Sequence, residues 1–227
     1  MKKLLNILSF AAILAIILPM MVFAGGKPFE GVITYKISYP DSKFTESQLA
    51  MFPKLMTVTV KGSKSKTEMS TGMGNQTEIN DYTDKTKVAL LDMMGQKYAI
   101  KETAAEIQKD MEKEPTAKVE VTNETKTIAG YFCKKATVTA EQDGEKTVYE
   151  VWFTNEIGSK DANFDNPLYK DIDGVLMEFL MKTPQITMKF TVSSVEKKSV
   201  SAKEFEIPAE YKLTTKEELK SKFGGME

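Results

Sequence analysis

The sequence predicts an α+β fold, in which a strongly curved antiparallel sheet (a half-barrel) holds two or three helices packed in its concave face. Short stretches that alternate apolar and polar residues recur at regular spacing along the chain, which is typical of antiparallel strands with one buried face. Only a few stretches have helical periodicity, so helices cannot cover both faces of a large sheet. A sheet that curves its apolar side round those few helices buries that side efficiently.

The N-terminus has the features of a secretory signal peptide over residues 1–24. Two lysines precede an apolar run from Leu4 to Phe23, and small residues follow at Ala24 and beyond. A retained membrane anchor is the alternative, because the run approaches the length that spans a bilayer. Pro19 and the small residues favour cleavage after Ala24, and no cysteine lies near the cut to carry a lipid.

Residues 25–227 are therefore expected to form one domain in the periplasm or outside the cell, with no transmembrane segment after cleavage. The chain has 31 basic and 32 acidic residues and a formal net charge of −1, which argues against binding to nucleic acid. Cys133 is the one cysteine, so no disulfide can form within the chain. A lone thiol in an oxidising compartment is more often a small buried hydrophobe than a reactive group, and we expect Cys133 to be buried.

The first half of the chain has the pattern of a meander of short strands. Ile33, Tyr35 and Ile37 alternate with polar residues, and Pro40 follows this first strand. The polar turns that separate the next strands contain glycine or aspartate. The expected strands cover residues 32–39, 56–61, 65–70, 77–80, 88–92 and 98–100, and others follow at 119–121 and 186–193.

Capping signals predict three short helices. A Thr precedes Glu or Gln by three residues, as in a capping box, at Thr45 and Gln48, at Thr103 and Glu106, and at Thr215 and Glu218. A proline follows each of the first two, and Gly224 follows the third. We expect helices over residues 45–52, 102–112 and 215–223.

The stretch from Thr127 to Thr154 predicts a well-specified β-hairpin. Asp143-Gly144 lies between two β-branched and aromatic runs, and this dipeptide favours a tight turn. With that turn, Glu141 lies opposite Lys146, an ion pair that a one-residue slip would remove. The apolar face of the hairpin then holds Ala136, Val138, Ala140, Tyr149, Val151 and Phe153, with Val138 facing Tyr149 and Ala136 facing Val151.

The stretch from Ile172 to Leu180 is predicted to be the most apolar helix of the mature chain. Apolar residues recur there at helical spacing, and Thr183-Pro184 follows. This helix is expected to fill the concavity of the sheet.

The residue types argue against an enzyme and against a metal site. The chain has no histidine, which removes the usual general base and the commonest zinc ligand. Asp161 to Asn166 resembles the start of a calcium loop, but Asn166 replaces the glycine and Ile172 the glutamate that such a loop requires. A surface loop is the favoured interpretation, and no cofactor is expected.

The methionine side chains are the remaining candidates for ligand or metal binding. Three of the 14 methionines leave with the signal peptide, and several others cluster in pairs. Core filling is the favoured interpretation, followed by the lining of an adaptable apolar pocket and then by a Cu(I) site.

Several short motifs together resemble an uncharacterised family of secreted bacterial β-rich proteins close to the GLPGLI family, and more distantly the LolA/LolB lipoprotein carriers. They are Lys61–Glu68, Asp81–Lys85, Gly130–Ala136, Trp152–Thr154 and Phe205–Pro208. The resemblance implies a LolA/LolB-like half-barrel with helices in the concavity, which holds acyl chains in the carriers.

Together these observations predict a non-enzymatic periplasmic or secreted protein with an apolar cavity, which binds or carries a lipid or a lipid-modified partner. A cell-envelope structural or interaction protein with a filled core is the alternative, and an enzyme or a Cu(I)-binding protein is the third. Core packing explains the proposed lining residues equally well. Those residues are Ile33, Tyr35, Ile37, Met56, Val58, Val60, Phe179, Leu180, Met188 and Phe190.

Overall fold

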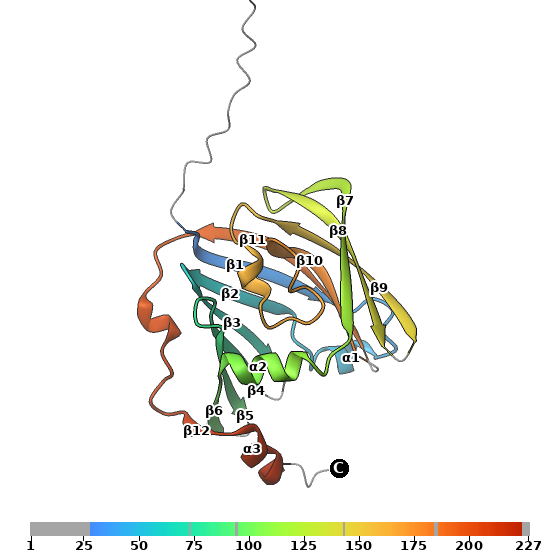
Figure 1. Cartoon of the computed structure of the whole chain (residues 1–227). Helices are drawn as coiled ribbons and strands as arrows, with labels where there is room; N and C mark the ends of the chain where they lie inside the picture. The colour runs from blue at the N-terminus through green and yellow to red at the C-terminus, as the bar shows by residue number, and fades with distance from the viewer. Residues whose placement is uncertain (1–27, 73, 94, 143, 184–185, 224–227) are drawn as a thin grey trace, which may run out of the picture.

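The computed structural model of the chain contains an open sheet of 12 strands (Figure 1). It describes residues 28–72, 74–93, 95–142, 144–183 and 186–223. The strands are β1 (Glu30–Ser38), β2 (Leu55–Lys61), β3 (Lys64–Thr71), β4 (Gly74–Asp81), β5 (Thr86–Met93), β6 (Gln96–Glu102), β7 (Thr116–Ile128), β8 (Tyr131–Gln142), β9 (Glu145–Thr154), β10 (Val175–Lys182), β11 (Thr187–Lys197) and β12 (Lys212–Thr214). The helices are α1 (Glu46–Leu49), α2 (Ala104–Met111), α3 (Lys216–Phe223) and the 3₁₀ turns η1 (Lys160–Asn163) and η2 (Ala202–Phe205).

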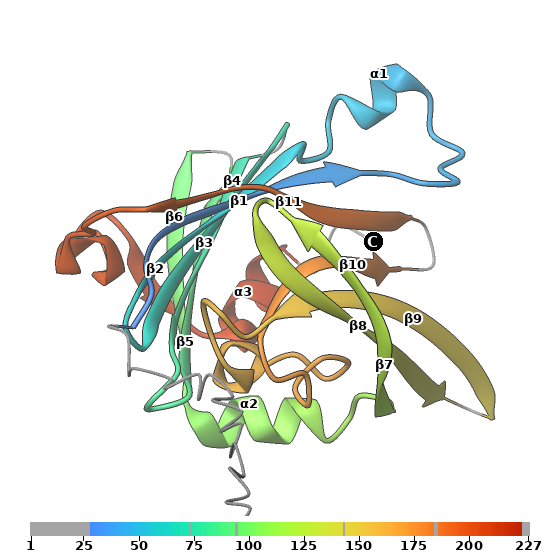
Figure 2. The ribbon, with the colours of Figure 1, turned by 90° about the horizontal axis from the view of Figure 1, so that it is seen from above.

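The strand order places the two halves of the chain on either side of β1. The order is β12-β6-β5-β4-β3-β2-β1-β11-β10-β9-β8-β7, with antiparallel neighbours throughout except for the parallel pair of β12 and β6. The connection that contains α2 runs from β6, near one end of the sheet, to β7 at the other end. The two end strands, β12 and β7, are not paired with each other, so the sheet is open. The connection that contains α2 crosses this open side (Figure 2).

The predicted α+β fold class is wrong, because the described residues are mostly strand and the helices do not pack in the concave face. The irregular segment between β9 and β10, residues 155–174, lies inside the curve of the sheet instead (Figure 2), and we call it the inner segment. Three of its side chains, Ile157, Tyr169 and Ile172, are buried in the main core. An irregular segment can occupy this place because its side chains supply the apolar surface that a helix was expected to supply.

The predicted helix from Ile172 to Leu180 is also wrong, since β10 begins at Val175. A bulge between Leu176 and Glu178 shifts the pairing of β10 with β9. The bulge lets both Leu176 and Met177 be buried before Phe179, and Ile172 is buried in the irregular segment just before β10, so the apolar residues of the two elements together recur with a spacing that resembles a helix. The bulge is the physical reason that periodicity gave the wrong element.

Aromatic rings organise the main core. Phe179 of β10 stacks on Phe190 of β11 with 4.8 Å between ring centroids, and Tyr35 and Tyr169 meet Phe179 edge-on at 6.1 and 5.8 Å. The hydroxyl of Tyr35 donates to the Leu176 carbonyl oxygen at 2.9 Å, and that of Tyr169 to the Leu180 carbonyl oxygen at 2.8 Å. These contacts attach β1 and the inner segment to β10.

A second, smaller cluster lies on the other face of the sheet. Ile79, Leu90 and Ala99 are buried beneath side chains of the segment that follows β11. Figure 1 shows this segment running beside the strands β2 to β6. Its covering residues are Phe205, Ile207 and Tyr211.

The predicted central hairpin is confirmed. In the β8–β9 pair, Val138 faces Tyr149, Ala136 faces Val151 and Glu141 faces Lys146. All six residues predicted for its apolar face are buried. Asp143 lies outside the described residues, and Gly144 has a φ of 80°, as the predicted tight turn requires.

The capping boxes at Thr45 and at Thr103 are confirmed, and both begin short helices. Residues 1–27 lie outside the described residues, so the signal peptide, the cleavage site and the single domain from residue 25 stay predictions. In the described part of the chain, no helix has the length and apolar character that crossing a bilayer would require.

A candidate ligand pocket beside Tyr82

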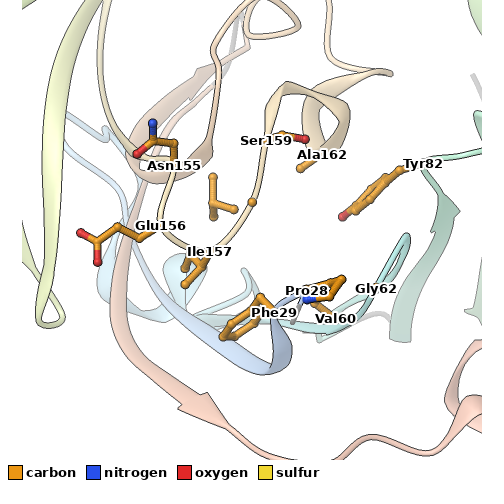
Figure 3. A pocket seen from close by; sticks show the side chains of 12 residues that line it. Pro28, Phe29, Val60, Gly62, Tyr82, Asn155, Glu156, Ile157, Ser159 and Ala162 are labelled. Atoms are coloured by element: carbon orange, nitrogen blue, oxygen red, sulfur yellow. The ribbon is translucent and has the colours of Figure 1, made fainter. Parts of the chain in front are cut away.

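A pocket of about 400 Å³ opens where several turns of the sheet meet the inner segment (Figure 3). The β2–β3 turn, the β4–β5 turn, the residues before β1 and the start of the inner segment each form part of its wall. The lining residues are Pro28, Phe29, Val60, Gly62, Tyr82, Asn155, Glu156, Ile157, Gly158, Ser159, Ala162 and Val175.

Tyr82 is held in the pocket wall by its turn. The Tyr82 amide donates to the Ser63 carbonyl oxygen at 2.7 Å, which joins the β4–β5 turn to the β2–β3 turn. The Asp81 carboxylate accepts from the Thr83 amide at 3.0 Å, and this closes the turn that follows Tyr82. The ring packs edge-on against Phe164 with centroids 6.2 Å apart. In Figure 3 the hydroxyl of Tyr82 points into the pocket.

The electrostatic surroundings of Tyr82 keep its hydroxyl protonated. Burial raises the pKa of Tyr82 to about 12, and the nearby Asp165 carboxylate adds to the increase. The Ser65 hydroxyl opposes this shift by hydrogen bonding to Tyr82. At neutral pH the pocket therefore presents a neutral hydroxyl group from Tyr82.

The inner segment forms the opposite wall and is anchored by a buried amide. The Nδ2 of Asn163 donates to the carbonyl oxygens of Ile172 and Gly174, at 3.0 and 2.9 Å. The Ser159 hydroxyl accepts from the Asp161 amide at 3.4 Å and starts η1. Because these bonds tie the middle of the segment to its C-terminal end, Ser159 and Ala162 keep a defined position across from Tyr82 (Figure 3).

The one acidic side chain of the pocket wall is directed away from it. Figure 3 shows the carboxylate of Glu156 pointing outward, past Ile157. The Glu156 carboxylate accepts from the Phe132 amide at 2.9 Å. Phe29, Ile157 and Val175 give the pocket its apolar surface.

A row of polar side chains continues from the pocket across the inner face of the sheet. Val60 faces Ser65, Ser65 faces Asn80, Asn80 faces Lys87, and Lys87 faces Glu102 in successive strand pairs. Cross-strand partners share one face of a sheet, so Val60 and the four polar side chains form one line from β2 to β6. The Oδ1 of Asn80 is buried and has no hydrogen-bond partner in the described residues.

Lys87 joins this row to the inner segment. Its Nζ lies 3.3 Å from Oδ2 of Asp165. Burial pulls the pKa of Lys87 down, but the carboxylates of Asp165, Glu78 and Glu102 raise it by more, so the net shift is upward. Lys87 is therefore charged at neutral pH and holds the inner segment against β5.

The ten predicted lining residues lie together in the main core. Ile33, Tyr35, Ile37, Val60, Phe179 and Phe190 are buried members of it, and Met56, Val58, Leu180 and Met188 pack against it partly buried. Val60 also lines the pocket beside Tyr82, and Ile37 lines a groove next to α1. The structure brings the ten residues together by mutual packing, and a role in ligand binding stays a prediction.

The other sequence candidates have separate outcomes. Cys133 is buried as expected, and burial raises the pKa of its thiol. The stretch from Asp161 to Asn166 is not a plain surface loop, because Asn163 is buried and Asp165 pairs with Lys87. Among the described residues, no group of three or more Cys, Asp or Glu side chains could hold a metal ion. The Cu(I) alternative for methionine stays untested.

Sequence reasoning missed the pocket beside Tyr82. Asp81–Lys85 is one of the short motifs behind the family resemblance, yet nothing in it shows that Tyr82 meets the inner segment. The residues from Asn155 to Ala162 have no periodicity, so they read as a loop on the surface. Most of them are exposed, but Ile157 is buried, and their position in the pocket wall depends on contacts between parts of the chain that are far apart in sequence.

A comparison with known families identifies residues 33–176 with the family described as N-glycanase peptide, N-terminal domain. No curated protein matches the chain. The resemblance to the GLPGLI family and to the LolA/LolB carriers is therefore wrong, because the match is to a specific and different family. The lipid-binding interpretation that rested on that resemblance loses its basis. The match agrees with an exported protein.

The matched span covers more than half of the 227 residues and includes the strands β2 to β9 in full. It also contains ten of the twelve pocket residues, from Val60 to Val175. The chain belongs to the family of the N-glycanase peptide N-terminal domain.

Proposed function

We propose that this protein is a non-enzymatic, exported binding module whose pocket beside Tyr82 receives part of a glycan. The observation that carries the proposal is the pocket itself, which the family match almost entirely includes. Its shape and lining suit a small ligand, since binding sites are concave and combine apolar walls with a few placed polar groups. The family description names an N-glycanase, and this directs the choice of ligand to glycans.

The lining residues support a ligand that has both hydroxyl groups and apolar faces. Phe29, Ile157 and Val175 offer apolar contact, whereas Tyr82, Ser159 and Asn155 offer hydrogen-bonding groups. Sugar rings present apolar faces edged by hydroxyl groups, so a sugar would use both kinds of surface. The Tyr82 hydroxyl is neutral at neutral pH, which suits an uncharged ligand.

Two observations support a role without catalysis. The sequence has no histidine, which removes the commonest general base. The carboxylate of Glu156 points out of the pocket and is hydrogen bonded to the Phe132 amide, so it does not face a bound ligand. We extend the proposal to location: a signal peptide over residues 1–24 directs the protein to the periplasm or outside the cell.

A cell-envelope interaction protein is the second candidate. It is favoured by the inner segment, whose residues Ile157, Tyr169 and Ile172 fill the concavity of the sheet. If the concavity is filled by the protein's own side chains, a partner would bind to the outer surface of the protein.

Titration of the isotope-labelled protein with an N-glycan-bearing glycopeptide, followed by NMR, tests the proposal. We expect shifts at the amides of Tyr82 and of residues 155–162. The variant Tyr82→Phe should weaken binding by about 5- to 10-fold, since it removes one hydrogen bond worth about 1 kcal/mol. The variant Tyr211→Phe makes the same change on the opposite face of the sheet and should leave binding unchanged. Absence of shifts at saturating glycopeptide, or equal weakening by both variants, would overturn the proposal.

A further inference from the structure

β7 gives the sheet a long free edge. It is the last strand in the sheet order, contains 13 residues and pairs only with β8. Along its other side, no backbone hydrogen bond to another described element is present. The opposite end of the sheet differs, because β12 pairs with β6 over Tyr98 to Ile100. A free edge of this length is a template for a further strand.

The regular part of this edge is short and well bounded. Pairing of β7 with β8 is continuous from Thr116 to Val121, and the register then shifts before Thr125. Pro115 precedes the strand and lacks an amide hydrogen. We define residues 116–122 as the edge segment.

The edge segment is nearly symmetric about its central residue, Val119. Its sequence is Thr-Ala-Lys-Val-Glu-Val-Thr, so a small or apolar residue lies two positions from the centre on either side. One position from the centre, Lys118 lies on one side and Glu120 on the other. Opposite charges at equal distances from a centre are self-complementary when two copies of a strand pair antiparallel.

Antiparallel pairing about Val119 gives each residue a matched neighbour. Lys118 lies opposite Glu120 of the second copy, and this pair occurs twice because of the twofold axis. Ala117 lies opposite Val121 of the second copy, also twice. A slip of two residues would place Lys118 opposite Lys118 or Glu120 opposite Glu120, so the charges select one register.

The side chains of the edge segment are available for such pairing. The side chains of Lys118 and Glu120 are 76% and 62% exposed and form an ion pair of 2.6 Å within one copy. An exposed ion pair is weak, so each side chain can pair with the second copy instead. Val121 is 58% exposed, although it lies opposite the buried Ala136. Lysines on edge strands usually repel a further strand. In this edge segment, Glu120 lies two residues from Lys118. A second copy places opposite charges against both residues, whereas a strand with another charge pattern does not, so the edge favours its own copy.

We propose that the protein forms a twofold-symmetric dimer in which the edge segments of two copies pair antiparallel about Val119. The dimer joins the two open sheets into one continuous sheet through main-chain hydrogen bonds. This inference does not depend on the glycan pocket.

Sedimentation velocity of the secreted chain over a range of concentrations, with charge-reversal variants, tests the dimer. Each single variant, Lys118→Glu or Glu120→Lys, places two like-charged pairs in the interface and should raise the dimer dissociation constant about tenfold. The double variant Lys118→Glu/Glu120→Lys restores both pairs with their charges exchanged and should return the dissociation constant to that of the wild type.

The control is Lys146→Glu, which reverses a charge in an exposed cross-strand pair with Glu141 on β8 and β9. It should leave dimerisation unchanged, and circular dichroism confirms that each variant is folded. A monomer at every concentration would overturn the inference. So would a double variant that dimerises as weakly as the single ones, or a control that weakens the dimer equally.

Discussion

Asn163 is the residue on which the inner segment most depends. Its amide is buried and donates to two backbone carbonyl oxygens, those of Ile172 and Gly174. Asn163→Ala would remove the donor to the Gly174 carbonyl oxygen and one of the two donors to the Ile172 carbonyl oxygen, which keeps the Gly174 amide, so we expect the free energy of unfolding to fall by about 2–3 kcal/mol. Urea denaturation measures this loss. Asn155→Ala, which removes the same amide from an exposed position, should change stability by less than about 0.5 kcal/mol, and similar losses in the two variants would contradict the assignment.

Glu78 should make the protein less stable as the pH rises. The Glu78 side chain is exposed, yet partial desolvation beside its neighbours raises the pKa of its carboxyl above the ordinary 4.5; Asp165 and Glu102 add to the shift, and Lys87 opposes it. The folded state therefore binds this proton more tightly than the unfolded state. The stabilising contribution is complete below the unfolded pKa and is lost as the pH rises through the folded pKa.

Because the Glu78 side chain is exposed and its charge is partly screened by solvent, we expect Glu78→Gln to unfold at only a slightly higher urea concentration than the wild type at neutral pH. The difference should disappear in acid below the ordinary pKa, where Glu78 is protonated in both states. Glu120 provides the control, because Lys118 lowers its pKa and Glu120→Gln should not stabilise the protein. A Glu78→Gln variant that is less stable at neutral pH would refute this account.

At the scale of elements, β10 depends on the close approach of Gly174 to the end of β9. A Cβ at Gly174 would lie 2.4 Å from the carbonyl oxygen of Thr154, in a backbone with φ of 155°. Gly174→Ala therefore requires the start of β10 to move away from β9, and we expect a loss of at least about 2 kcal/mol in thermal or urea unfolding.

Gly130→Ala is the matched control for the β10 prediction. Gly130 also has a positive φ, 87°, but no atom lies within 4 Å of a Cβ placed there. Its substitution should cost only the backbone strain, about 1 kcal/mol. Equal losses for the two glycines would show that crowding at Thr154 is not the cause.

The elements differ in how well their sequence predicts them, and the reason is the range of the contacts that define them. The β8–β9 hairpin is local, so its turn and the pair of Glu141 and Lys146 were enough to predict its register. β10 pairs regularly with β11 but with β9 through a bulge, and no local pattern distinguishes that bulge from a helical spacing.

For the whole molecule, alternation predicted that the chain is rich in strands but not how they are ordered. The order places β1 next to β11, and that neighbour is fixed by pairs such as Ile37 with Phe190 that are distant in sequence. The pocket was equally inaccessible to prediction, since Tyr82 and Ser159 come from segments with no shared periodicity. Contacts of this kind arise only when the complete sheet has formed.

The open side of the sheet is held by Lys216, which connects three elements. Its Nζ lies 2.9 Å from the Glu102 carboxylate at the end of β6 and 2.7 Å from the Asp110 carboxylate of α2. Glu102 is buried, so Lys216→Met would leave its charge without this partner and should cost about 2–3 kcal/mol in urea unfolding. Hydrogen exchange should also become faster in α2 and in β12, because α3 loses its attachment to β6 and α2 and because β12 leads directly into α3. Lys113→Met is the control. The Nζ of Lys113 lies 2.7 Å from the Asp110 carboxylate, but this ion pair is exposed, so its loss should change the free energy of unfolding by less than about 0.5 kcal/mol. If the two methionine variants unfold alike, the open side does not depend on Lys216 and the α2 crossing is held by its own packing through Ile107.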